Sequence, residues 1–209
     1  MQRGRFITVE GIEGVGKSSN MGVLVATLEA AGIEVLTTRE PGGTPVAEDI
    51  RSLLKDRGDE PIPEITELLL MFAARSLNVN NVIVPALNAG KWVVCDRFTD
   101  SSRAYQGGGR GLAMETINQL ANWVHGDTWP DLTILLDAPV EIGMARASSR
   151  GSPDRIEQEK HEFFERVRQT YLDLAAAEPE RFVVVDTRRE LELVQADVEA
   201  IAQQLIANT

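Results

Sequence analysis

A glycine-rich segment near the N-terminus constrains this chain more than any other feature. It reads Gly-Ile-Glu-Gly-Val-Gly-Lys-Ser from Gly11 to Ser18. An apolar, β-prone run precedes it at 6–9, and apolar residues at helical spacing follow it over 20–31. The order strand, glycine loop, helix is that of a P-loop, whose backbone amides and helix start surround phosphate oxygens. Lys17 is expected to reach the outer phosphates, and Ser18 offers a hydroxyl to Mg²⁺.

Composition limits the partners and the location. The chain has 209 residues, 43% of them hydrophobic, which is enough for one domain with a buried core over 1–209. A net charge of −11 opposes adhesion to nucleic acid polymers or anionic lipid, so any polyanion it binds must be small and met by local arginines. The single cysteine, Cys95, allows no internal disulfide and favours a cytoplasmic location. We find no apolar run near the roughly 18 residues that span a membrane, and expect no membrane insertion.

Strand-like and helix-like segments alternate along the chain, which predicts an α/β fold. Its expected form is a five-stranded parallel sheet with helices on both faces, a three-layer α/β/α arrangement. The expected strands are 6–9, 33–37, 92–95, 132–136 and 182–185. The expected helices are 20–31, one starting at Pro45, 64–89 with a break near Pro85, 112–125, 139–148, 154–177 and 191–206. We expect Val46, Ile50, Leu53 and Leu54 to be buried, and the polar, glycine-rich segment 98–111 to be a loop outside the core.

Charged residues follow the ends of three predicted strands. These are Lys17, Arg39 and the pair Asp96-Arg97. The carboxyl ends of parallel strands share one edge of the sheet, where ligands bind, so these residues should lie close together. The adjoining Arg97 favours Asp96 as a functional residue over the aspartates that end the fourth and fifth strands.

A P-loop alone leaves kinases, GTPases, ATPases and nucleotide-binding modules open. The Asn-Lys-x-Asp signature of guanine readers is missing from the sequence, and the arginines outside the P-loop suit a second phosphorylated substrate. At this point the chain resembles the bacterial thymidylate kinases over nearly its whole length. The matching motifs, in order, are Gly11–Ser18 with an acid at Glu13, Arg39-Glu40-Pro41-Gly42-Gly43-Thr44, Phe72-Ala73-Ala74-Arg75, Asp96-Arg97, Ala104-Tyr105-Gln106-Gly107-Gly108-Gly109, and Arg150 with Asp154-Arg155-Ile156-Glu157.

The resemblance implies a P-loop kinase that transfers the γ-phosphoryl group of ATP to dTMP, with Mg²⁺, and that forms a homodimer. It implies metal contacts at Ser18 and Asp96, and catalytic roles for Lys17, Arg97, Asp96 and Arg150. Arg150 belongs to a segment at about 146–156 that the resemblance implies is a mobile lid over the site. Ser148 and Ser149 stand where some relatives carry additional arginine. The catalytic arginine of the lid could therefore also be Arg146 or Arg155. The implied ATP-binding residues are Gly11, Ile12, Glu13, Gly14, Val15, Gly16, Lys17, Ser18, Ser19 and Arg146.

The resemblance also implies a dTMP site. Arg39 and Arg97 would hold the phosphate, and Glu13 would lie near the sugar 3′-hydroxyl or a metal-bound water. Tyr105 would exclude ribose, and Phe72 would stack on thymine. The residues implied for the polar edge of the base are Arg51, Arg75, Ser102 and Gln106.

Two other functions are compatible with the P-loop. One is a kinase for another nucleoside monophosphate or for a deoxynucleoside. The other is a nucleotide-binding regulator that does not hydrolyse its ligand, although such a protein has no need of Arg39, Arg97 and Arg150 together. For the homodimer, the apolar helices after the second and third strands are the candidate interfaces.

Overall fold

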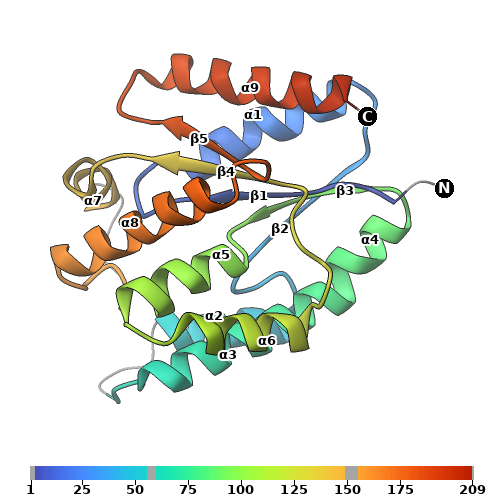
Figure 1. The fold of residues 1–209 in the computed structure, drawn as a ribbon. Helices are drawn as coiled ribbons and strands as arrows, with labels where there is room; N and C mark the ends of the chain where they lie inside the picture. The colour runs from blue at the N-terminus through green and yellow to red at the C-terminus, as the bar shows by residue number, and fades with distance from the viewer. Residues whose placement is uncertain (1–2, 56–59, 149–154, 209) are drawn as a thin grey trace.

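The computed structural model describes residues 3–55, 60–148 and 155–208. In these residues five strands form one parallel sheet in the order β2-β3-β1-β4-β5, with helices around it (Figure 1), which confirms the predicted fold class. The strands are β1 (Phe6–Glu10), β2 (Val35–Arg39), β3 (Trp92–Asp96), β4 (Leu132–Asp137) and β5 (Phe182–Asp186). The second strand begins two residues later than predicted, because the Ile33 amide still bonds to Leu28 at the helix end.

More of the helices lie on one face of the sheet than on the other (Figure 1). Two of them, α1 and α9, pack together on one face, while α4, α5 and α8 lie on the other, with α2, α3 and α6 beyond them. The helices that the structure describes are α1 (Lys17–Ala30), α2 (Pro45–Lys55), α3 (Glu64–Asn78), α4 (Val84–Asn88), α5 (Thr99–Ser102), α6 (Met114–Val124), α7 (Val140–Ser148), α8 (His161–Ala177) and α9 (Leu191–Ala207), with the π-helical turns η1 (Val79–Ile83) and η2 (Arg103–Gly109).

The central strand β1 is buried on both faces. Ile7 and Val9 pack in the core that includes α1 and α9, whereas Phe6 packs against Ile83 and Phe98 on the opposite face. Because side chains alternate along a strand, Glu10 at its end lies on the same face as Phe6. β1 lies between β3 and β4, so the P-loop that follows it opens where the strand order changes direction, the usual ligand site of such sheets.

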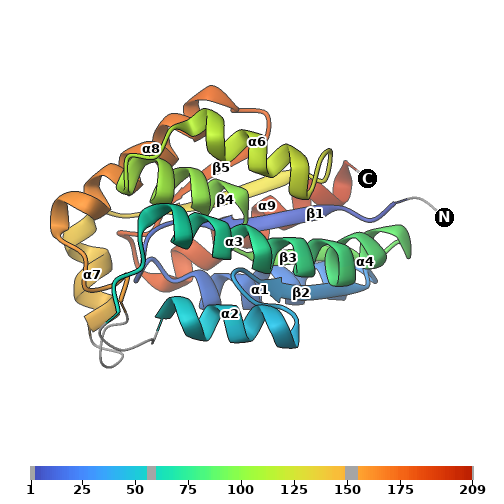
Figure 2. The same ribbon diagram turned by 90° about the horizontal axis from the view of Figure 1, so that it is seen from below.

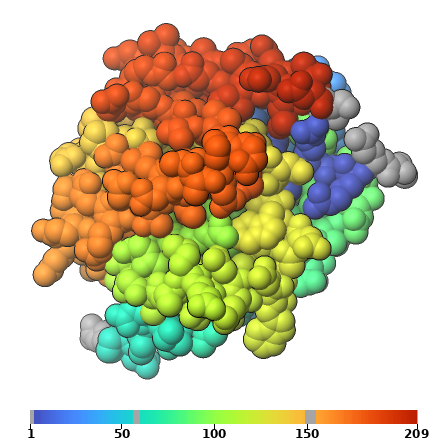
Figure 3. All heavy atoms as spheres, in the orientation of Figure 1, coloured from blue at the N-terminus to red at the C-terminus, as the bar shows by residue number. Residues whose placement is uncertain are grey.

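The segment 98–111 is not the loop predicted from its composition. It forms α5 and η2, and Tyr105, Gln106 and Gly107 are buried. Gly108 and Gly109 pack directly against α8, where a Cβ atom would collide with side chains of that helix. In the space-filling view this segment and α8 adjoin along the surface (Figure 3). Gly108 and Gly109 therefore allow η2 to pack closely against α8, and they do not form a flexible turn.

Several predicted boundaries and core positions were wrong. Pro85 lies in the first turn of α4, where its missing N–H is tolerated, and the irregularity falls upstream as η1. Helix α8 begins at His161, and the predicted start at Asp154 lies outside the described residues. Of the four residues of α2 expected in the core, only Leu54 is buried, whereas Ile50 is half-buried and Val46 and Leu53 are 57% and 53% exposed.

The helical stretch Glu64–Asn88 corrects the expectation about apolar runs. Its mean hydropathy reaches 1.3, so among the described residues it is one helix long and apolar enough to cross a membrane. Core helices of globular proteins pass the same test. This stretch carries Glu67 and Arg75, which are buried and ion-paired inside the protein.

Candidate functional site

The P-loop curls at the carboxyl end of β1. Its glycines adopt backbone conformations that other residues rarely reach, with φ of 133° at Gly11, 74° at Gly14 and 89° at Gly16. The Lys17 ammonium bends back over the loop and donates to the carbonyls of Gly11 (3.0 Å) and Ile12 (2.8 Å). Burial, reinforced by Arg97, lowers the pKa of Lys17 to about 8. A lysine ammonium held in this way is positioned to bind phosphate oxygens at the loop.

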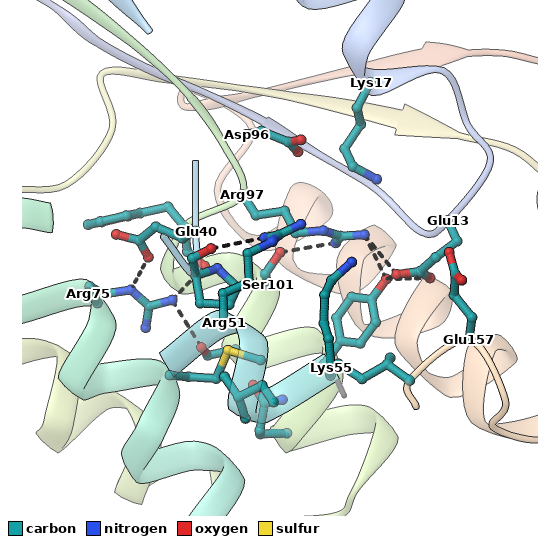
Figure 4. Close-up of a pocket in the computed structure, with 18 of the residues that line it drawn as sticks. Glu13, Lys17, Glu40, Arg51, Lys55, Arg75, Asp96, Arg97, Ser101 and Glu157 are labelled. Carbon is teal, nitrogen blue, oxygen red and sulfur yellow. Dashed lines mark hydrogen bonds and ion pairs between the residues drawn. The ribbon is translucent and has the colours of Figure 1, made fainter. Parts of the chain in front are cut away.

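A cavity of about 220 Å³ opens beside the loop (Figure 4). It brings together residues from the P-loop, α1, α2, α3, β3, α5 and η2, as the shared edge of the sheet predicts. The predicted site residues that line it are Glu13, Gly14, Gly16, Lys17, Ser18, Arg51, Arg75, Asp96, Arg97, Ser102, Tyr105 and Gln106.

Arg97 lies at the end of this cavity next to the P-loop. Its Nη2 donates to Glu13 Oε1 (3.0 Å) and to the Tyr105 hydroxyl (3.1 Å), and its Nη1 donates to the hydroxyls of Ser101 (3.2 Å) and Tyr171 (3.3 Å). Burial opposes the charge, but the surrounding tyrosines and Glu13 hold the pKa of Arg97 well above its usual value. The guanidinium is therefore fixed and charged beside the P-loop.

Arg75 lies at the other end of the cavity and is almost fully buried. Its Nε donates to Glu40 (2.6 Å), and its Nη2 donates to the Phe98 carbonyl (3.0 Å) and the Ser102 hydroxyl (3.1 Å). Its Nη1 is buried and finds no partner within the described part of the chain. Because a buried donor without a partner is unfavourable, this N–H is suited to an acceptor on a ligand.

Gln106 is held in one orientation by Glu67. The Gln106 amide nitrogen donates to Glu67 Oε1 (2.8 Å), and the same carboxylate is paired with Arg110 and Arg155. Burial opposes ionisation of Glu67, but these hydrogen bonds hold its pKa below its ordinary value. With its nitrogen occupied, Gln106 presents its carbonyl oxygen as an acceptor.

Asp96 and Ser18 suit a hard cation. Asp96 Oδ1 is shielded from solvent and has no hydrogen-bond partner among the residues described. The Ser18 side chain lines the same cavity from the start of α1. Oxygen ligands of this kind are those that Mg²⁺ uses beside phosphates.

Other predicted residues lie outside the cavity. Arg39 is 53% exposed and pairs with Glu48, so the structure does not bring it to the side of Arg97. Phe72 packs in an apolar cluster with Leu68 and Ile117, its ring 4.5 Å from the Arg75 guanidinium. Ile12 and Val15 are core residues, and Ser19 is an exposed residue of α1.

The two lid arginines that the structure describes, Arg146 and Arg155, lie in different places. Arg155 donates to the Leu54 carbonyl (2.9 Å) and pairs with Glu67, away from the P-loop. Arg146 donates to the Thr187 carbonyl (2.9 Å) and lines a groove along Gly14 and Gly16. Arg150 falls in 149–154, outside the described residues.

Sequence reasoning missed several residues at the site. Lys55 and Glu157 line the cavity, and Thr187 lines the groove beside Arg146. Ser101 and Tyr171 hold Arg97. Two of the missed residues carried a local signal, Lys55 as a cation near Arg51 and Glu157 as part of the motif with Arg150, whereas Ser101, Tyr171 and Thr187 lie in segments distant from one another in the sequence.

The fold and the site together define the class of protein to which this chain belongs. A P-loop on the central strand of a parallel sheet faces a cavity that has an arginine at each end. This arrangement is that of a P-loop kinase acting on a second, phosphorylated substrate.

Comparisons with known proteins identify the family within this class. The thymidylate kinase family profile matches residues 9–198. The chain is 54% identical to the thymidylate kinases of Ectopseudomonas mendocina (strain ymp) and Pseudomonas syringae pv. tomato, covering 97% of each chain. The crystal structure of thymidylate kinase from Ehrlichia chaffeensis superposes with a TM-score of 0.77 at 32% identity, over 96% of this chain and 99% of that one.

The chain belongs to the thymidylate kinase family. It is an enzyme that phosphorylates dTMP to dTDP with ATP as the phosphoryl donor, and the two other functions left open by the P-loop are set aside.

Proposed function

We propose that dTMP occupies the cavity with its phosphate at Arg97 and its base at Arg75, and that ATP lies along the P-loop. The unpartnered Nη1 of Arg75 is the observation that carries this orientation, because it requires an acceptor at the end of the cavity opposite Arg97. A thymine carbonyl oxygen meets that requirement. The Arg97 guanidinium, already charged and fixed, suits the phosphate.

The polar edge of the base is read by a donor and an acceptor. Arg75 Nη1 donates to the O4 carbonyl of thymine, and the Gln106 carbonyl oxygen accepts the N3–H proton. Ser102 and Arg51 support this end of the site: Ser102 accepts from Arg75, and Arg51 is anchored on the Pro41 carbonyl (2.9 Å). Tyr105 lines the sugar region, where its hydroxyl donates to Glu13 (2.7 Å). Phe72 does not line the cavity, and we propose that it supports the Arg75 guanidinium, which lies 4.5 Å from its ring, rather than stacking on the base.

Phosphoryl transfer requires positioning and charge neutralisation more than covalent chemistry. Lys17 and the amides of the P-loop hold the phosphates of ATP, with Arg146 at the groove beside the loop. Arg97 holds the acceptor phosphate in line with the donor. Arg150 supplies positive charge to the transferring group, a role that depends on the family resemblance.

Asp96 and Ser18 would hold Mg²⁺. The shielded, unpartnered oxygen of Asp96 fits a divalent cation in the described site. When bound, Mg²⁺ neutralises charge on the β- and γ-phosphates. We place Glu13 near the sugar 3′-hydroxyl or a metal-bound water, since its carboxylate already lies between Arg97 and Tyr105.

Arg97→Ala tests the proposed site. The value of kcat/KM for dTMP is expected to fall about 10²- to 10³-fold, because a charged group at the acceptor phosphate is lost. The affinity for ATP, measured by calorimetry without dTMP, is expected to change less than about threefold. Arg39→Ala is the matched control and is expected to stay near wild type, since Arg39 pairs with Glu48 outside the cavity. A wild-type kcat/KM in Arg97→Ala would refute the assignment.

The chain is proposed to act as a single kinase domain, in the cytoplasm, and as a homodimer. Free Cys95 is buried, in keeping with a reducing compartment. The helices α2, α3 and α6 lie side by side on one surface (Figure 2), and each exposes large apolar side chains. These are Val46, Leu53, Ile65, Leu69 and Trp123, which are between 51% and 85% exposed. An apolar surface of this kind favours association with a second copy.

Leu69→Glu is expected to convert the dimer to a monomer, because it introduces a charge into the middle of the proposed interface. Leu69 is 53% exposed on α3. Equilibrium sedimentation of wild type and variant measures the change directly. Leu193→Glu on α9 is the matched control, since Leu193 is 55% exposed on the opposite side of the sheet, and this variant is expected to remain dimeric. Wild-type protein that sediments as a monomer would disprove the interface.

A further inference from the structure

Glu10 is a buried carboxylate with no assigned role. It is the last residue of β1, is fully shielded from solvent, and immediately precedes the P-loop. Its Oε1 accepts from the Phe98 amide (2.7 Å), and its Oε2 accepts from the Ser101 hydroxyl (2.6 Å) and the Tyr171 hydroxyl (2.7 Å). A buried acid that accepts three hydrogen bonds calls for an explanation beyond packing, since the rest of the strand is apolar apart from Thr8.

All three partners of Glu10 act on Arg97. The hydroxyls of Ser101 and Tyr171 each accept a hydrogen bond from Arg97 Nη1, and they also lie 2.8 Å from each other. The third partner, the Phe98 amide, belongs to the peptide bond that follows Arg97. Arg97 has a φ of 68°, a left-handed conformation that is unfavourable for arginine and persists only when its surroundings fix it.

We propose that Glu10 is the positioning residue for Arg97. One carboxylate oxygen holds the backbone directly after Arg97, and the other orients the two hydroxyls that hold its guanidinium. This inference rests on the proposed function of Arg97 as the ligand of the dTMP phosphate. Glu10 itself is not among the residues that line the cavity, so it acts through Arg97 rather than on the substrate.

The arrangement requires an ionised Glu10. An ionised carboxylate accepts at both oxygens, whereas a protonated one must donate from one of them and so breaks the pattern. The charged and titratable groups that face Glu10 are Asp100 of α5, Arg97 after β3, Cys95 of β3, Tyr171 of α8 and Lys17 of α1. Burial, with Asp100, raises the pKa of Glu10 to about 7, against the opposing effects of Arg97 and the two hydroxyls.

A double-mutant cycle of Glu10→Gln and Arg97→Ala tests the coupling. We measure kcat/KM for dTMP at saturating MgATP at about pH 8, where Glu10 is ionised. Glu10→Gln alone is expected to lower it by about 10- to 100-fold with little change in KM for ATP. In the Arg97→Ala background the same substitution is expected to have less than about a threefold effect, because its target is gone. Equal effects in the two backgrounds would overturn the inference.

Asp100→Asn is the matched control. Asp100 is also a fully buried carboxylate, but it pairs with Arg103 and Arg181 and makes no hydrogen bond to Arg97. Its effect is therefore expected to be equal with and without Arg97. Tyr171→Phe gives a second cycle if Glu10→Gln does not fold, since it removes one link between Glu10 and Arg97 and keeps the charge. Arg97→Ala with wild-type kcat/KM would instead refute the proposed function, and this inference with it.

The pH profile supplies an independent readout. The ratio of kcat/KM between wild type and Glu10→Gln cancels the ionisation of the dTMP phosphate, which both enzymes share. Since Glu10 gains its charge as pH rises, the wild-type value divided by the Glu10→Gln value is expected to rise between about pH 6 and 8, with a midpoint near 7. A ratio that stays constant over this range would contradict the positioning role.

Discussion

Replacing Arg150 with alanine is expected to lower turnover by about 10³- to 10⁵-fold while the KM for dTMP stays nearly unchanged. Arginine fingers act on charge that develops in the transition state, so their loss appears in kcat rather than in ground-state binding. Arg150 lies outside the described residues. Its assignment depends on the family resemblance and on the contacts of the two neighbouring arginines.

The neighbouring arginines Arg146 and Arg155 serve as controls for the Arg150 variant. Arg155 is engaged by Glu67 and the Leu54 carbonyl, so Arg155→Ala is expected to reduce thermal stability more than turnover. Arg146 contacts the Thr187 carbonyl beside the P-loop, so Arg146→Ala is expected to raise KM for ATP. Single-turnover kinetics with all three variants separates chemistry from binding. A fall of less than tenfold in Arg150→Ala, with a larger fall in either control, would transfer the catalytic role to that arginine.

The discrimination against dCMP is the second large effect expected. Thymine offers an acceptor at O4 and a donor at N3, whereas cytosine offers the reverse, a donor at N4 and an acceptor at N3. The Arg75 N–H would then face an amino group, and the Gln106 oxygen would face a lone pair. Mismatched hydrogen bonds in a closed site discriminate by about 10⁴-fold, so dCMP is expected to be nearly inert.

The same reasoning ranks other substrates. dUMP keeps the hydrogen-bonding edge and lacks only the methyl group, which is worth about 10- to 200-fold. UMP adds a 2′-hydroxyl beside Tyr105 and is expected to be poorer still. We would measure kcat/KM for dTMP, dUMP, dCMP and UMP at saturating MgATP, and repeat the series with Arg75→Ala, which should lose dTMP activity but retain ATP binding. Comparable values for dCMP and dTMP would exclude the donor–acceptor pair as the basis of selectivity.

The parts of the structure that sequence reasoning predicted depend on local signals. Hydrophobic periodicity and apolar character predicted all five strands, and the helix expected to start at Pro45 is α2, where Thr44 Oγ1 accepts a hydrogen bond from the Ala47 amide. The rule that ligands bind at the carboxyl edge of a parallel sheet predicted the convergence of Lys17, Asp96 and Arg97.

The remainder depends on contacts between distant segments. Composition predicted a loop at 98–111, but packing against α8 overrides that local preference. Arg39 follows a strand as expected, yet Glu48 nine residues later draws it out of the cavity. The role inferred for Glu10 requires Ser101 and Tyr171, which are 91 and 161 residues away along the chain. No local pattern encodes such a contact.

The glycine packing between η2 and α8 has a consequence for how selectivity can change during evolution. Tyr105 and Gln106 project into the cavity from the same turn whose Gly108 and Gly109 press on α8. A Cβ on Gly109 would come within 2.5 Å of the Phe163 ring, so even alanine there would displace the turn and both cavity-lining side chains with it. Mutational tolerance at this turn is therefore set by α8, a helix that contributes no residue to the cavity lining. A mutant library restricted to the residues that line the cavity would omit Gly108 and Gly109, which hold those residues in position.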